Sequence, residues 1–162
     1  MINCFMCGNE MTDNSYYCYS CGSKVEIEIK QDTVNGSSNG WVEYDRDNYG
    51  DVYFYNKASV KHTTKYIVQV WCKVVYSDED RKMLIQQLRK AGLPSNGYNK
   101  LSHRLHLEKI DYKKRKYQTL SLSEYDTDGR VLFSGSSDKQ DWEHIIPDSI
   151  MDTLQKKFVN DQ

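Results

Sequence analysis

The arrangement of apolar and polar residues changes character near residue 41. From there on, six segments are rich in apolar, aromatic and β-branched residues, a composition typical of β-strands, and residues 66–76 alternate in character from residue to residue. These segments are residues 41–44, 52–55, 66–76, 101–112, 117–125 and 131–133. The connections between them are short, which favours antiparallel pairing.

Two segments of the same region instead carry apolar residues three or four positions apart, the spacing of one helix face. The first follows Ser77 with an acidic first turn and a stripe of Leu84, Ile85, Leu88 and Ala91, and Gly92 and Pro94 are expected to end it. The second follows Asp148, the expected N-cap, with Ile150, Met151, Leu154 and Phe158. The sequence therefore predicts an α+β fold, in which a six-stranded antiparallel sheet domain with packed helices follows a small zinc ribbon.

The first 40 residues predict two further parts. Residues 1–30 are loop-like, except that residues 25–30 alternate as a short strand would. Residues 31–40 are rich in Gly, Ser and Asn and predict a flexible linker. The predicted domains are a zinc ribbon over 1–30, a linker over 31–40 and a sheet domain over 41–162.

The ribbon prediction depends on two Cys-x-x-Cys-Gly motifs. Cys4 and Cys7 form one pair, and Cys18 and Cys21 form the other. Each such turn places two thiolates on one side of a tight loop, so that two turns together supply four sulfurs in a tetrahedron. We expect one structural Zn²⁺ at Cys4, Cys7, Cys18 and Cys21, with no open position for catalysis.

Disulfides, a redox Cys-x-x-Cys and an iron–sulfur centre are the alternatives. A redox motif needs one pair beside a βαβ unit, and iron–sulfur centres suit other spacings. The segment also resembles the short bacterial zinc-ribbon family, whose pattern has Tyr or Phe directly before the second motif, as Tyr17 stands here.

Composition bears on location and partners. The formal net charge is −1, so no global field attracts nucleic acid or an anionic membrane. The N-terminus lacks a basic region followed by an apolar core, and no apolar run approaches the roughly 18 residues of a membrane span. The sequence-based expectation is therefore a cytoplasmic protein without membrane association, a compartment that also suits reduced thiols.

From Trp41 onward the chain resembles the surface-adhesin protein E family of bacteria. The resemblance is carried by residues 53–60, 70–75, 107–112, 125–129 and 142–150. It implies six antiparallel strands with a helix packed on the sheet, and binding of host extracellular proteins if the chain is exported. Exported members usually carry a disulfide, but Tyr112 stands where the first cysteine is expected and residues 157–160 offer no second.

Three function classes follow, and protein binding is the preferred one. An enzyme is not expected, because His62, His103, His106 and His144 are scattered and Cys72, on the apolar face of its strand, resembles an inert buried thiol. His103 and His106 are three apart in a strand and should face opposite sides of the sheet.

Nucleic-acid binding is the alternative, through the ribbon or the basic residues 113–116. However, residues 1–30 hold four acidic and two basic side chains, which disfavours phosphate. We therefore expect a non-enzymatic zinc-binding adaptor or sensor module with a protein partner, or a homodimer, and alternatively a surface-adhesin-like host-protein binder.

Overall fold

The computed structural model describes residues 2–3, 10–11, 40–136 and 141–159 of the 162-residue chain. The chain divides into two compact units, residues 1–36 and 37–162. In the first unit, β1 (Ile2–Asn3) pairs antiparallel with β2 (Glu10–Met11). The four cysteines of the predicted metal site lie outside the described residues.

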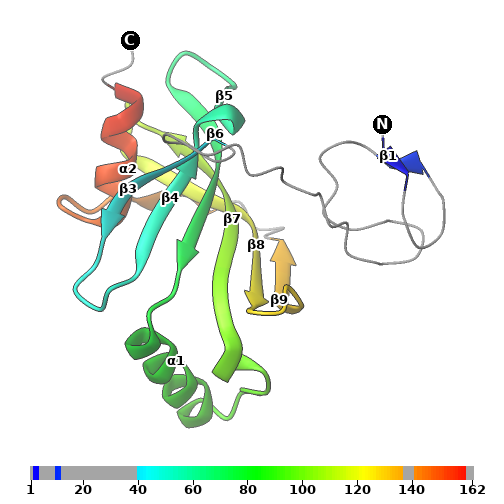
Figure 1. The fold of residues 1–162 in the computed structure, drawn as a ribbon. Coiled ribbons are helices and arrows are strands. Elements are labelled where there is room, and N and C mark those ends of the chain that lie inside the picture. Colours follow the sequence, from blue (N-terminus) through cyan, green and yellow to red (C-terminus); the bar gives the residue numbers. More distant parts are fainter. Residues whose placement is uncertain (1, 4–9, 12–39, 137–140, 160–162) are drawn as a thin grey trace. The chain divides into compact units, whose positions relative to one another are not determined.

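The second unit is an antiparallel sheet with two helices, which confirms the α+β prediction for this part of the chain (Figure 1). The strands are β3 (Trp41–Arg46), β4 (Val52–Asn56), β5 (Lys61–His62), β6 (Ile67–Val75), β7 (Leu101–Asp111), β8 (Lys116–Asp126), β9 (Val131–Ser136) and β10 (Glu143–His144). The helices are α1 (Asp78–Lys90) and α2 (Ile150–Val159), and two 3₁₀ turns are η2 (Lys57–Ser59) and η3 (Tyr98–Lys100).

The predicted strand number is wrong, because the sheet has eight strands and not six. Its main order is β10-β8-β7-β6-β4-β3, with β5 added beside β6 and β9 beside β8. The two unpredicted strands, β5 and β10, each have only two residues, which are exposed. Two residues are too few to show an alternating pattern, so neither strand has a sequence signal.

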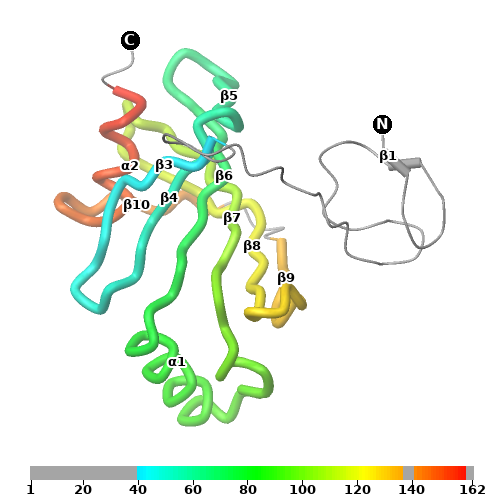
Figure 2. Tube along the Cα trace, in the orientation of Figure 1, coloured from blue at the N-terminus to red at the C-terminus, as the bar shows by residue number. Residues whose placement is uncertain are grey.

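The central strands of the sheet follow one another along the chain as a meander, which Figure 2 traces from β6 through α1 to β7 and β8. Ser77 caps α1 as predicted, since its side chain accepts a hydrogen bond from the Asp80 amide (3.1 Å). The helix ends at Lys90, and Gly92, two residues later, has a φ of 69° that allows the Leu93 amide to donate to the Leu88 carbonyl (2.9 Å). The α1 helix lies at one end of the sheet and has no fully buried residue.

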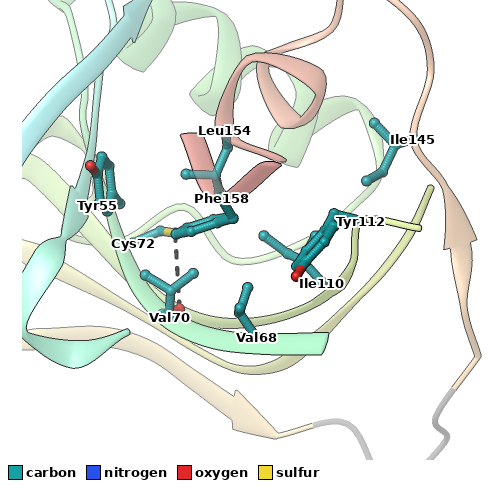
Figure 3. Close-up of a cluster of buried hydrophobic side chains, with 9 residues drawn as sticks. All are labelled: Tyr55, Val68, Val70, Cys72, Ile110, Tyr112, Ile145, Leu154 and Phe158. Carbon is teal, nitrogen blue, oxygen red and sulfur yellow. Dashed lines mark hydrogen bonds between the residues drawn. The ribbon is translucent and has the colours of Figure 1, made fainter. Parts of the chain in front are cut away.

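The main core lies between α2 and one face of the sheet, called here the covered face. Figure 3 shows Leu154 and Phe158 of α2 pointing toward Val70 and Cys72 of β6. Alternation along β6 explains this packing, because Val68, Val70, Cys72 and Val74 are buried on the same face. The cap of α2 differs from the prediction: the Ser149 hydroxyl, not Asp148, accepts from the Asp152 amide (3.2 Å).

Candidate functional site

The opposite face of the sheet, called here the open face, is covered by neither helix, because α2 packs on the covered face and α1 lies at the sheet's end (Figure 1). All three tryptophans of the chain lie on this face, one each on β3 and β6 and one beside β10. Its central residues are Trp41, Phe54, Trp71, Lys73, Leu105, Leu107, Lys109 and Trp142.

Lysine–aromatic contacts organise this surface. The Lys73 ammonium lies 4.7 Å from the Trp41 ring centroid and 5.0 Å from that of Phe54. The Lys109 ammonium lies 5.7 Å from the Trp142 ring. Cation–π contacts of this kind hold both partners in place. Burial lowers the pKa of Lys73, which is consistent with a lysine partly withdrawn from water by these rings.

Trp71 is 39% exposed and Val75 is 37% exposed, although both lie in the sheet rather than in a loop. Large apolar side chains kept exposed on a regular strand are typical of binding surfaces. Tryptophan is also the residue type most enriched at protein–protein contacts. The open face is therefore the candidate protein-binding surface of this domain.

The covered face holds the chain's other candidate chemistry. Strand pairing places Cys72 opposite His106, and Glu108 lies two residues further along β7 on the same face. No local sequence pattern predicts this cluster, because it depends on the register between β6 and β7. His103 lies on the open face, stacked on Tyr125 with ring centroids 5.0 Å apart. The prediction that His103 and His106 face opposite sides is therefore confirmed.

Cys72 does not have the environment of a nucleophile. Its thiol is fully buried, and burial raises its pKa well above the ordinary value, with the Glu108 carboxyl adding to the effect. A reactive thiol needs a lowered pKa and access to a substrate. The contact at Cys72 Sγ is a weak one, to the Val70 carbonyl at 4.0 Å.

The basic turn 113–116 is largely engaged within the protein. The Arg115 guanidinium bonds the buried Asp152 carboxylate (2.9 Å), and the Lys113 ammonium lies 4.6 Å from the Tyr66 ring. The Lys114 amide donates to the Asp111 carboxylate (2.8 Å). Two of the four cations of the turn, those of Arg115 and Lys113, are therefore engaged in internal contacts, which weakens the nucleic-acid alternative.

The described part of the chain also contains residues of the types that bind metal ions. Its His, Cys, Asp and Glu residues form no group of three or more that could hold a metal ion. Asp47, in the β3–β4 turn, accepts from the amides of Tyr49 (2.9 Å) and Asp51 (3.0 Å) and from the Tyr53 hydroxyl (3.1 Å). The Asp47 carboxylate therefore stabilises the β3–β4 turn.

Comparisons with known proteins place the sheet domain in a family. A family model described as surface-adhesin protein E matches residues 41–158. Two structures of Haemophilus influenzae protein E align with 78% of this chain at 11% identity. The alignments include 88% and 91% of the two protein E chains, and their TM-scores are 0.46 and 0.47. A search of curated proteins gave no significant match. None of the described helices is long and apolar enough to cross a membrane.

Proposed function

Because this chain belongs to the surface-adhesin protein E family, we propose that its sheet domain is a non-enzymatic domain that binds host extracellular proteins. The observation that carries the proposal is the uncovered open face, where exposed Trp71 lies beside the lysine–aromatic contacts of Lys73 and Lys109. The adaptor or sensor function expected from the sequence has less support than adhesin-type binding.

The cytoplasmic location expected from the sequence is wrong, because the match is to a family of surface adhesins. That expectation depended on the first residues and on the thiols of the predicted ribbon. Neither feature belongs to the sheet domain, which is the part that the family match covers. Tyr112 also has a structural role that is independent of compartment: its hydroxyl bonds the Lys65 carbonyl and its ring packs edge-on against Tyr66.

The chemistry of the open face suggests what kind of surface it binds. Aromatic rings supply rigid apolar area, and the ammonium groups over them supply positive charge at fixed positions. A complementary partner would present apolar side chains with acidic residues among them. We expect a protein interface rather than a deep small-molecule site on this face, because its residues lie along regular strands.

Binding to a panel of immobilised extracellular-matrix proteins tests the proposal. Trp71→Ser should weaken binding by about thirtyfold, the effect of losing a central interface residue. The matched control is Phe133→Ser, since Phe133 is a strand aromatic with 51% exposure on the other face of the sheet. Equal loss in both variants, or binding that survives Trp71→Ser, would reject the open face as the binding surface.

Self-association through the same face is the second option, and sedimentation velocity separates the two. A dimer that becomes monomeric on Trp71→Ser, with no matrix binding in either protein, would make the open face a homodimer interface. A wild-type monomer that binds a matrix protein would support the adhesin proposal.

We also propose that Cys4, Cys7, Cys18 and Cys21 bind one structural Zn²⁺. The motif spacing supports this, and so does the pairing of β1 with β2, which brings together the residues flanking the first motif. For a family of surface proteins, two disulfides among the same cysteines are the competing arrangement.

A further inference from the structure

A cavity of about 420 Å³ lies on the covered face of the sheet. Three of its four charged or imidazole side chains come from β7, where Arg104, His106 and Glu108 alternate along the same face, and the fourth is His144 of β10. The walls are formed by aromatic and aliphatic side chains, among them Tyr44, Tyr53, Leu122, Ile146, Ile150 and Met151. Its volume is within the range of small-molecule sites, roughly 300–1,000 Å³.

Arg104 is a half-buried cation with no carboxylate within ion-pair distance among the described residues, although Glu108 and Asp80 interact with its charge from farther away. Glu124 lies opposite it in the register of β7 and β8, but the Glu124 carboxylate accepts instead from the Tyr98 hydroxyl (2.7 Å). The guanidinium carbon lies 5.6 Å from the Tyr76 ring, and the buried Nε has no hydrogen-bond partner in the described part of the chain. Buried charges are normally paired, so an unpaired guanidinium in the middle of a sheet points to a missing anion.

His106 is the second polar group without a full set of partners. Its buried Nδ1 has no hydrogen-bond partner among the described residues, and its Nε2 lies 3.6 Å from Glu108 Oε1. Burial lowers the pKa of His106 to about 4 and raises that of Glu108 to about 7, so both groups are neutral between these values. At 3.6 Å the Glu108 carboxyl lies beyond hydrogen-bond distance of Nε2, so the neutral imidazole can carry its proton on Nδ1.

Of the two unsatisfied atoms, Arg104 Nε is always a hydrogen-bond donor, and His106 Nδ1 is a donor in the tautomer that carries its proton there. The Glu108 oxygens are already used, since the Thr119 hydroxyl lies 2.9 Å and 3.1 Å from them. The group that this cavity lacks is therefore an acceptor with negative charge. Arg104 supplies one positive charge, which matches a single carboxylate better than a dianion.

We propose that this cavity binds a small organic acid, with its carboxylate against Arg104 and His106 and its apolar body against Leu122, Ile146 and Met151. Ile146 is 70% exposed and lies at the mouth, where an apolar ligand would cover it. The site is on the opposite side of the sheet from the open face, so it is independent of the proposed protein binding.

Isotope-edited NMR of the full chain tests this with phenylacetate as the probe. At about 10 mM, where a site of ~1 mM affinity is nearly saturated, signals of Leu122, Met151 and His106 should shift saturably. Phenylacetamide, which has the same shape but no charge, should bind about tenfold more weakly or worse, the loss of one charge-assisted hydrogen bond. Phenyl phosphate should also bind more weakly, because it carries a second charge.

Substitution provides the second arm. Arg104→Met should reduce phenylacetate binding to the level of phenylacetamide. The matched control, Arg46→Met, should leave it unchanged, because Arg46 is exposed and paired with Glu43 (2.6 Å). If Arg104→Met does not fold, the order of affinities of the three probes for the wild-type chain still tests whether the site prefers a single negative charge. The proposal is overturned if phenylacetate causes no saturable shift, if the amide binds equally well, or if phenyl phosphate binds more tightly.

Discussion

Glu108 and His106 are neighbours on β7 whose pKa values move in opposite directions for the same reason. Burial disfavours the charged form of each group, so the carboxyl pKa rises from 4.5 to about 7 and the imidazole pKa falls from 6.5 to about 4. The Arg104 cation adds to the effect at His106. The pair is therefore a neutral pair rather than a salt bridge at mildly acidic pH.

This arrangement predicts opposite pH dependences for two variants. Glu108 contributes stability that is full below pH 4.5 and is lost as the pH rises through about 7, whereas the contribution of His106 is full above pH 6.5 and is lost as the pH falls toward 4. Relative to wild type, Glu108→Gln should gain stability from pH 5 to pH 7.5, and His106→Gln should lose it. Each change should be about 2 kcal/mol between these two pH values.

Urea unfolding at the two pH values measures both changes. A charged pair would reverse the signs, because the carboxyl pKa would then be lowered and the imidazole pKa raised. Thr119→Val is the control, since it removes the hydroxyl that bonds Glu108 without removing a titrating group. Its stability should still depend on pH in the same direction as that of the wild type.

Single residues mark the limit of sequence reasoning about the site. Alternation in residues 66–76 correctly placed Cys72 on the apolar face, because period two is a local property of a strand. Its position opposite His106 depends on strand pairing, which no local pattern encodes. The same limit applies to the open face, since Trp41, Trp71 and Trp142 are distant in sequence and are placed on one face only by the strand order of the sheet.

At the scale of elements, one buried carboxylate ties α2 to the rest of the sheet domain. Asp152 accepts from Arg115 (2.9 Å), Gln155 (2.7 Å) and the Asp148 amide (3.0 Å), and it pairs with Lys156 (2.9 Å). The bond from Lys156 is the largest of the effects that hold the pKa of Asp152 well below its usual range. The Asp152 carboxylate therefore holds together three segments: the basic turn, the loop before α2 and α2 itself.

Removing that anchor should destabilise the domain. Asp152→Asn should lower Tm by about 5 °C or more, because Arg115 loses its buried partner and the amide cannot accept all of the same bonds. Circular dichroism melting measures this. Lys156→Met is the comparison variant, and its Tm should fall by less, because the Lys156 side chain is 58% exposed and water can replace its bond to Asp152. Equal losses in the two variants would place the stabilisation in the exposed ion pair instead.

The long elements were predictable, and the two-residue strands were not. Strands β6, β7 and β8 and both helices have enough residues to show a period, and all five lie near their predicted positions. Strands β5 and β10 are held by pairing with β6 and β8, so tertiary contacts define them. Ser149 replaces Asp148 as the cap of α2 because Asp148 takes a positive φ of 60°, outside the conformation of an N-cap.

At the scale of the whole molecule, the question is whether the two units fold independently. The division between residues 36 and 37 falls within the predicted linker 31–40. The second unit has its own core on α2 and β6, so its folding needs no contribution from a metal. A ribbon of about 30 residues is too small to hold a core and would depend on its zinc or its disulfides.

We therefore expect purified full-length protein to contain one zinc per chain, and a chelator to remove the NMR dispersion of residues 1–30 alone. The signals of residues 41–159 should stay in place, because their fold is held by the sheet and α2. Serine substitution of Cys4 and Cys18 should reproduce the chelated spectrum, while Cys72→Ser should leave zinc content unchanged, since Cys72 belongs to the buried core.

Four cysteines found oxidised by non-reducing mass spectrometry, with no zinc, would establish disulfides in place of the metal. Loss of the sheet signals on chelation would instead mean that the ribbon is part of the main fold and that the units are not independent.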